Sequence, residues 1–153
     1  MKAHYISHIH IEKLWGNDKP IALDLHEDVN IIIGPNASGK TTIINLLMFT
    51  LTGNVIRLMD YQFDYITVTL KAFESGKELV VKVTKTKEEL RFELAGKAYP
   101  FPQIPEPIRL RHGHFANMPS EMLRRQFSAE LFTLKRSLEG LVPAAWLLVR
   151  IEA

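Results

Sequence analysis

The run Val29-Asn30-Ile31-Ile32-Ile33-Gly34-Pro35-Asn36-Ala37-Ser38-Gly39-Lys40-Thr41-Thr42 decides how this chain folds. Its first five residues are mostly β-branched and apolar, which is typical of a short strand buried on both faces. Residues 34–41 fit the spacing G-x-x-x-x-G-K-S/T, in which backbone N–H groups surround a phosphate. The sequence therefore predicts a strand, a phosphate-binding loop (P-loop) and a helix in direct succession.

The residue types in this loop are the ones that phosphate binding requires. Gly34 and Gly39 allow a tight path and close approach of the backbone to the phosphates. Lys40 is expected to bridge the β- and γ-phosphates, the Thr41 hydroxyl to ligate Mg²⁺, and Thr42 to serve the α-phosphate side. The plain alternative is a glycine-containing turn without a ligand. The predicted nucleotide-binding residues are Gly34, Pro35, Asn36, Ala37, Ser38, Gly39, Lys40, Thr41 and Thr42, with Thr41 as the metal ligand.

The segments around the loop predict the rest of the fold. A helix is expected over residues 39–51, from the apolar spacing of Ile43, Ile44, Leu47, Met48 and Leu51, with Gly53-Asn54 ending it. Before the loop, residues 1–12 predict a half-buried strand that places Tyr5, Ile9 and Ile11 on one face, and residues 21–25 a second, antiparallel strand. After the helix, alternation over residues 66–71, 79–84 and 90–94 predicts an antiparallel meander.

The last third of the chain is expected to hold one helix. Residues 99–107 contain four prolines and predict an extended connector. Ser120 is a suitable N-cap for a helix that runs to about residue 139. Two interpretations of its apolar stripe stay open, a packed core and a coiled coil, the core being the simpler. The stripe consists of Leu123, Phe127, Leu131, Leu134 and Leu138.

Composition narrows the class of protein. The chain has 153 residues, 46% of them hydrophobic and 24% charged, which fits one globular domain with a real core. It has no cysteine, which excludes disulfides and thiolate metal sites, and its net charge of +2 permits nucleic-acid contact without arguing for it. No signal peptide or long apolar span is present, so the sequence predicts a cytoplasmic protein without a membrane segment.

The N-terminal third resembles the ATPase heads of the SMC, RecF and double-strand-break-repair family, including bacterial "AAA family" ATPases. The resemblance rests on Ile9-His10-Ile11-Glu12-Lys13-Leu14-Trp15-Gly16, on residues 29–33 and on residues 34–42, with Asn36 matching the family's pattern and Ala37 departing from it. It implies ATP and Mg²⁺ as cofactors, and association of two heads around two ATP molecules. Partners would be DNA or a nuclease, in DNA repair or phage defence.

In that family the loop after the first strand contacts the nucleotide, so the resemblance places Trp15 and Gly16 near the ribose and base. Basic or hydroxyl side chains commonly do this work, so Trp15 is a departure. Stacking on adenine and packing beneath the P-loop helix are both open, packing being the simpler interpretation.

Other elements of the family are not found among the 153 residues. There is no L-S-G-G signature and no apolar run ending in Asp-Glu, the Walker B motif; the nearest candidate, residues 147–152, is interrupted by Arg150. Gln62, Gln103 and Gln126 are all poor candidates for the family's Q-loop glutamine. We therefore expect the N-terminal lobe of a head that binds ATP but hydrolyses it poorly, completed by a C-terminal lobe or a second chain.

Three weaker signals have plain explanations. His8 and His10 share a strand face as metal ligands would, but an exposed face explains them more simply. His112-Gly113-His114 predicts a polar turn. The pairs Arg124/Arg125 and Lys135/Arg136 could meet DNA phosphates, although a solvated helix face is the default.

Together these observations predict an α/β fold: a P-loop NTPase core with an antiparallel β-subdomain and a C-terminal helix. We expect a single domain, residues 1–153, made of residues 1–58 (strands, P-loop and helix), 59–100 (meander) and 101–153 (connector and helix). Two alternatives stay open. One is a small P-loop phosphotransferase, with arginines such as Arg109 and Arg111 in a lid. The other is a nucleotide-sensing module that does not hydrolyse its ligand.

Overall fold

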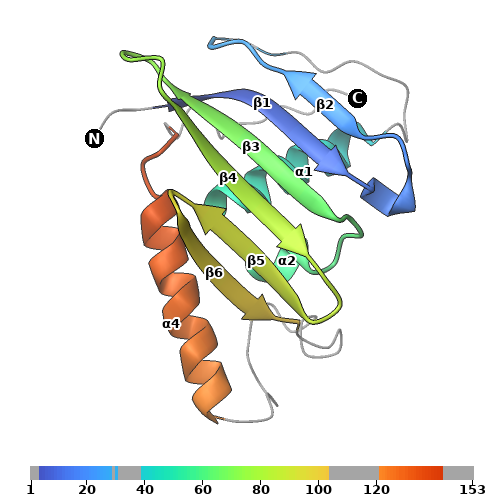
Figure 1. The fold of residues 1–153 in the computed structure, drawn as a ribbon, viewed down its shortest axis with the longest axis vertical. Coiled ribbons are helices and arrows are strands. Elements are labelled where there is room, and N and C mark those ends of the chain that lie inside the picture. The colour runs from blue at the N-terminus through green and yellow to red at the C-terminus, as the bar shows by residue number, and fades with distance from the viewer. Residues whose placement is uncertain (1–3, 29, 31–38, 104–120, 143–153) are drawn as a thin grey trace.

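The structure, a computed structural model, describes residues 4–28, 30, 39–103 and 121–142. Its centre is an antiparallel sheet in the order β2-β1-β3-β4-β5-β6 (Figure 1). The strands are β1 (His4–Glu12), β2 (Ile21–Asp24), β3 (Tyr65–Ala72), β4 (Glu78–Lys85), β5 (Glu89–Leu94) and β6 (Lys97–Pro102). The helices are η1 (Leu14–Gly16), α1 (Lys40–Thr52), α2 (Val55–Leu58) and α4 (Glu121–Leu138).

The sheet and the helices form two layers. Helices α1 and α2 lie against one face of the sheet, and α4 lies beside β6 (Figure 1). Strand alternation explains this, because one parity of each strand carries the apolar side chains that face the helices. The α/β class expected from the sequence is confirmed. The central buried residues include Ile9, Ile11, Leu46, Leu58, Ile66, Val68, Leu70, Val81, Val83, Leu90, Phe92, Phe101, Phe127 and Leu134.

The meander and the N-terminal strands share one sheet. The antiparallel pairings of β1 with β2, β3 with β4 and β4 with β5 were predicted, and all three are present. In addition, β1 pairs with β3 along almost its whole length, from His4 opposite Ala72 to Glu12 opposite Tyr65. The predicted strand at residues 29–33 lies outside the described residues, apart from Asn30.

A bulge in β1 corrects the predicted facing of Tyr5. The register against β3 shifts between Ile6 and His8, so Ser7 is the extra residue. As a result Ile6 is buried with Ile9 and Ile11, whereas Tyr5 lies on the opposite face, where its ring contacts Phe73. The simple alternation of the sequence cannot show this change of parity.

The prediction of an extended connector at residues 99–107 is wrong for the first residues of that range. Lys97–Pro102 forms strand β6, which joins β5 through the two-residue turn Ala95-Gly96. β6 is an edge strand, where Pro100 and Pro102 can be accommodated because the missing N–H groups face away from the sheet. Residues 104–107 lie outside the described part.

Helix α1 ends as predicted, at Gly53 in the left-handed conformation. Its buried face differs from the prediction, since Leu46 and Thr50 are fully buried while Ile44 and Met48 are half-buried. The Thr50 hydroxyl is satisfied because it donates to the carbonyl of Leu46 at 2.7 Å. The short helix α2 follows directly, with the Asn54 side chain as its cap, and was not predicted.

The stripe of α4 packs as core. Phe127, Leu134 and Leu138 are buried and Leu131 packs against them, which favours the core interpretation over a coiled coil. The Phe101 ring of β6 lies 5.2 Å from the Phe127 ring, and the Tyr99 hydroxyl lies 2.8 Å from that of Ser137. None of the described helices combines the length and apolar character needed to cross a lipid bilayer.

Candidate functional site

The start of α1 carries the described part of the predicted loop. Gly39, Lys40, Thr41 and Thr42 are described, whereas residues 34–38 lie outside the described part of the chain. Thr41 is exposed, and the other three are half-buried. The predicted cationic and hydroxyl side chains therefore stand together on the first turn of a helix.

Gly39 shapes this end of the helix. It is the N-cap residue, with φ of 95°, and its carbonyl accepts the first helical hydrogen bond, from the N–H of Ile43 at 2.9 Å. Having no side chain, it cannot cap the first N–H groups of α1 itself. No acidic residue lies in the first turn. The positive end of α1 is thus suited to an external anion.

Trp15 lies directly against this helix start, although it is distant in sequence. A Cβ atom on Gly39 would lie 3.2 Å from Cη2 and 3.3 Å from Cζ3 of the Trp15 indole. Trp15 is 54% exposed. The simpler interpretation of the sequence, that this residue packs beneath the P-loop helix, is therefore wrong. The fold therefore brings the two segments of the predicted site, Trp15-Gly16 and residues 39–42, side by side.

The turn that carries Trp15 has an unusual backbone. Lys13, Trp15 and Gly16 all have positive φ, at 59°, 57° and 74°. For a bulky residue this conformation is strained, at about 1–3 kcal/mol, and such strain is concentrated at functional sites. The turn is closed by two backbone bonds, from Gly16 N–H to the Lys13 carbonyl and from Asn17 N–H to the Leu14 carbonyl.

Gln62 supports the same turn from the segment before β3. The N–H of Trp15 donates to the Gln62 carbonyl at 2.9 Å. The Gln62 Nε2 atom lies 3.3 Å from the position that a Cβ on Gly16 would take. This contact could not be predicted from the sequence, because it joins two distant segments through backbone groups and not through a motif.

An exposed ion pair closes the outer side of the turn. Lys13 Nζ donates to Asp18 Oδ1 at 2.6 Å. This hydrogen bond raises the pKa of Lys13 above its usual value and lowers the pKa of Asp18 below its usual value. The pair therefore stays charged until the pH falls through the lowered pKa of Asp18 or rises through the raised pKa of Lys13. Because water screens both groups, the pair contributes little to stability.

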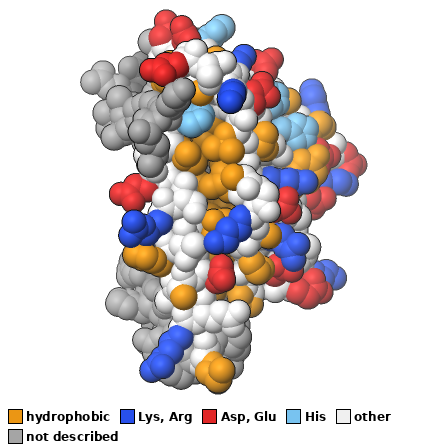
Figure 2. All heavy atoms as spheres, turned by 60° about the vertical axis from the view of Figure 1, so that its left-hand side comes forward, with side chains coloured by type: hydrophobic (Ala, Val, Ile, Leu, Met, Phe, Trp, Pro, Cys, Tyr) orange, Lys and Arg blue, Asp and Glu red, His pale blue; other side chains and the backbone are white. Residues whose placement is uncertain are grey.

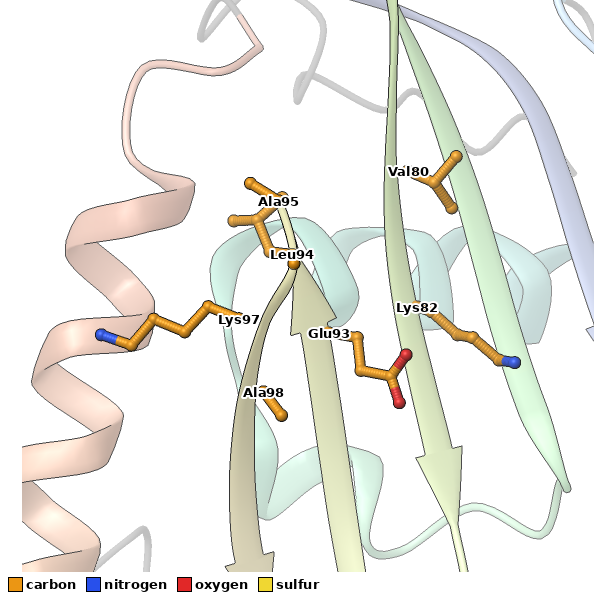
Figure 3. Close-up of a pocket in the computed structure, with 8 residues that line it drawn as sticks. Val80, Lys82, Glu93, Leu94, Ala95, Lys97 and Ala98 are labelled. Carbon is orange, nitrogen blue, oxygen red and sulfur yellow. The ribbon is translucent and has the colours of Figure 1, made fainter.

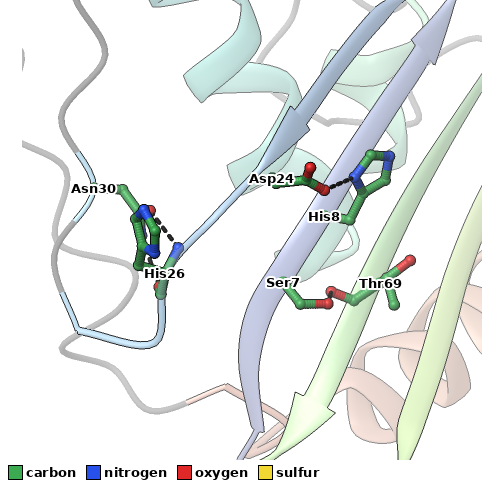
Figure 4. A network of polar contacts seen from close by, with 6 residues as sticks. All are labelled: Ser7, His8, Asp24, His26, Asn30 and Thr69. Carbon is green, nitrogen blue, oxygen red and sulfur yellow. Dashed lines mark hydrogen bonds and ion pairs between the residues drawn. The ribbon is translucent and has the colours of Figure 1, made fainter.

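Two of the three histidines of β1, His8 and His10, contact a carboxylate. His8 Nδ1 lies 2.7 Å from Asp24 on the neighbouring strand, as Figure 4 shows, and His10 Nε2 lies 3.0 Å from Glu12. In the same view the Ser7 hydroxyl, at the bulge, donates to the Thr69 carbonyl. The described residues contain no group of three or more potential metal ligands. His112 and His114 lie outside the described part.

A shallow hollow lies on the face of the sheet that is turned away from α1 and α2. It has a volume of about 310 Å³ and is lined by residues of β4, β5 and β6, among them Val80, Lys82, Glu93 and Lys97 (Figure 3). None of its lining residues belongs to the Trp15 turn or to α1.

Charges are intermixed on the surface. Figure 2 shows hydrophobic side chains along the middle of one face, with basic and acidic side chains on both sides of them. On α4, Arg125 and Lys135 are exposed and the Arg136 guanidinium lies over the exposed Phe132 ring at 5.7 Å. This arrangement corresponds to the solvated helix face expected by default.

Comparison with known proteins identifies a family for this chain. The family model described as "AAA domain" matches residues 9–139, which include both the Trp15 turn and the start of α1. No curated protein matches the chain. One similar solved structure is described by the words "ATP-driven dimerization and DNA stimulated activation of SMC ATPases"; the similarity covers 83% of this chain and 99% of that chain, with 16% identity and a TM-score of 0.44. Because the family model matches most of its length, the chain belongs to the AAA domain family.

Proposed function

We propose that the chain binds ATP with Mg²⁺ at the N-terminal end of α1. The observation that carries the proposal is the contact between Trp15 and Gly39, which joins an exposed aromatic ring to the positive end of a helix. Membership of the AAA domain family supports nucleotide as the ligand.

The described residues fit a nucleotide. Because Gly39 has no Cβ, the Trp15 ring can come close to the start of α1. The first N–H groups of an α-helix have no acceptor within the helix and suit phosphate oxygens. Lys40 supplies a positive charge for the β- and γ-phosphates, and the exposed Thr41 hydroxyl supplies a hard oxygen ligand for Mg²⁺. The metal would neutralise phosphate charge. Thr42 serves the α-phosphate side.

The base and ribose belong on the side of Trp15 and Gly16 in this proposal. Trp15 is exposed beside the helix start, and a flat aromatic ring can stack on a purine. The other residues that complete the P-loop motif are Gly34, Pro35, Asn36, Ala37 and Ser38. All of them except Pro35, which has no N–H, can supply further backbone donors.

We further propose that the chain acts as part of an SMC- or RecF-like head. Its sequence resemblance to such heads supports association of two heads upon ATP binding, and DNA or a nuclease as the partner, in DNA repair or phage defence. The 153 residues contain no L-S-G-G signature and no Walker B run, so we expect the isolated chain to bind ATP with little turnover.

The first prediction tests the phosphate site. Lys40→Ala removes the charge-assisted contacts to the phosphates, each of which contributes about 1.5–3 kcal/mol, so the affinity for MgATP should fall by at least about 100-fold. Calorimetric titration measures the affinity, and thermal unfolding should show a melting temperature close to that of the wild type.

The control is Lys87→Ala, which removes an exposed lysine in the β4–β5 turn and should leave binding unchanged. Equal MgATP affinity in Lys40→Ala and the wild type would contradict the assignment. Rapid turnover by the isolated wild-type chain, measured on the same sample, would contradict the expectation of poor hydrolysis and favour a small phosphotransferase.

A further inference from the structure

Lys85 occupies an unusual position at the end of β4. It follows Val81 and Val83 on the parity of the strand that faces the helices, where an apolar side chain is the rule. Its side chain is half-buried, and its ammonium group lies 5.5 Å from the centre of the Phe63 ring. A lysine in such a place needs polar partners to offset the loss of hydration.

Those partners are carbonyl groups of the segment between α2 and β3. The Lys85 ammonium donates to the carbonyls of Met59, at 2.8 Å, and Tyr61. The Lys85 backbone N–H donates to the carbonyl of Asp64 at 2.9 Å. Three carbonyls of residues 59–64 are therefore held by this one residue. Met59 is the C-cap of α2, where a cation is favoured.

This segment in turn supports the Trp15 turn. The Gln62 carbonyl accepts the N–H of Trp15, and the N–H of Asp64 donates to the carbonyl of Glu12 at the end of β1. Trp15 then contacts Gly39 at the start of α1. A continuous series of contacts thus leads from the Lys85 ammonium, through Gln62 and Trp15, to the phosphate end of the proposed site.

We propose that Lys85 is a positioning residue for nucleotide binding: it holds the 59–64 segment so that Trp15 stands beside Gly39. Lys85 does not touch the nucleotide in this proposal. The inference rests on the proposed function, because it assigns the nucleotide to the side of Trp15. It predicts that loss of Lys85 acts only through Trp15.

A double-mutant cycle tests this point. MgATP affinity is measured for the wild type, Lys85→Met, Trp15→Ala and the double variant. We expect Lys85→Met to weaken binding by about 5- to 20-fold, and the double variant to bind no more weakly than Trp15→Ala alone, because residues in one network are not additive. A purely structural role would lower the affinity by the same factor in both backgrounds.

Magnesium tripolyphosphate is the second probe, because it has phosphates and no base. Lys85→Met and Trp15→Ala should change its affinity by less than about 2-fold, since the phosphate end of the site is intact in both. An equal loss of MgATP and tripolyphosphate binding in Lys85→Met would overturn the proposal.

Two further variants separate position from charge. Lys85→Arg keeps a cationic donor and should recover most of the MgATP affinity. Lys82→Met, on the same strand, removes an ammonium group that lies over Tyr65 on the opposite face and should have no effect. If Lys85→Met fails to fold, Lys85→Gln enters the same cycle, because it keeps a neutral donor. If the wild type binds MgATP but the effects of Lys85→Met and Trp15→Ala are additive, this inference alone is overturned. If the wild type binds neither MgATP nor magnesium tripolyphosphate, the proposed function is overturned as well.

Discussion

Single residues with positive φ mark where the chain accepts local strain. Lys13 and Trp15 adopt this conformation in the turn beside α1, and Ala95 adopts it in the turn between β5 and β6. An L-residue there costs about 1–2 kcal/mol relative to a right-handed or extended conformation. In the first turn the strain accompanies the contact of Trp15 with Gly39. In the second, nothing in the structure requires alanine.

Ala95→Asn is therefore expected to stabilise the protein. A two-residue hairpin with φ of 51° at Ala95 and 78° at Gly96 is the geometry in which Asn-Gly is preferred, because asparagine tolerates the left-handed region better than alanine. We expect a gain of about 0.5–1 kcal/mol in the free energy of unfolding, measured by urea denaturation. The control Ala98→Asn, on an exposed strand position, should not stabilise. A destabilised Ala95→Asn would contradict the assigned turn.

At the scale of elements, Gly53 joins two helices. It ends α1 in the left-handed conformation, with φ of 68°. A Cβ at this position would lie 3.2 Å from both Leu138 Cδ1 and Lys135 Cγ of α4. The C-terminal end of α1 therefore approaches α4 as closely as a glycine permits, and the same residue serves the helix end and the helix contact.

Gly53→Ala should cost more than the backbone conformation alone. We expect a loss of about 2–3 kcal/mol, of which about 1–2 kcal/mol is the left-handed backbone and the rest is displacement of α4. Gly76→Ala is a matched control, because Gly76 has φ of 70° and nothing within 4 Å of the added methyl group. Both variants are measured by chemical denaturation. An equal loss in the free energy of unfolding would show that α4 can move away from the added methyl group at no cost in stability, which would contradict the prediction.

Elements with a clear period were predictable from the sequence. Strands β1 to β5 follow alternation, apart from the bulge at Ser7 in β1, and α1 and α4 follow helical spacing. β6 was missed because Pro100 and Pro102 indicate a connector unless the strand is known to lie at an edge. The buried face of α1 was misjudged because that helix is apolar on most sides, so its period does not favour Leu46 over Met48.

At the scale of the whole molecule, one aromatic series ties the sheet to α4. Phe101 of β6 is fully buried between Phe92 of β5, at 6.4 Å, and Phe127 of α4, at 5.2 Å between ring centres. Both contacts have edge-to-face geometry, which aromatic pairs prefer. The edge strand is thus fixed from both sides by one side chain.

Phe101→Ala should remove a large part of the stability. Loss of a buried phenylalanine costs about 3–5 kcal/mol, and a domain of this size has only about 5–15 kcal/mol in total. Phe132→Ala, on the exposed side of α4, is the control and should cost less than about 1 kcal/mol. Similar melting temperatures for the two variants would show that β6 and α4 do not share the core.

For the proposed site, the sequence predicts the chemistry of its residues but not the way in which the separate segments come together. Residues 34–42 were predicted as a phosphate-binding loop, because G-x-x-x-x-G-K-S/T lies between a predicted buried strand and a predicted helix. Of these residues the structure describes only 39–42. The contact of Trp15 with Gly39 and the role of Gln62 depend on pairings between distant segments, which spacing along the chain does not reveal. The position of Lys85 did have one indication in the sequence, because this lysine follows Val81 and Val83 at the alternate positions of β4 that are otherwise apolar.

The contact between His4 and Leu141 has a mechanical consequence. The N–H of His4 donates to the Leu141 carbonyl at 2.9 Å, and its imidazole Nδ1 lies 3.2 Å from the same oxygen. A pull on the residues that follow α4 would therefore load the His4–Leu141 contact together with the packing of Leu141 and Val142 on the core. Bonds loaded one after another open at lower force than bonds loaded together, so this junction would yield before the long β1–β3 ladder. Tension would thus release residues 141 and 142 while the sheet that supports Trp15 stays intact.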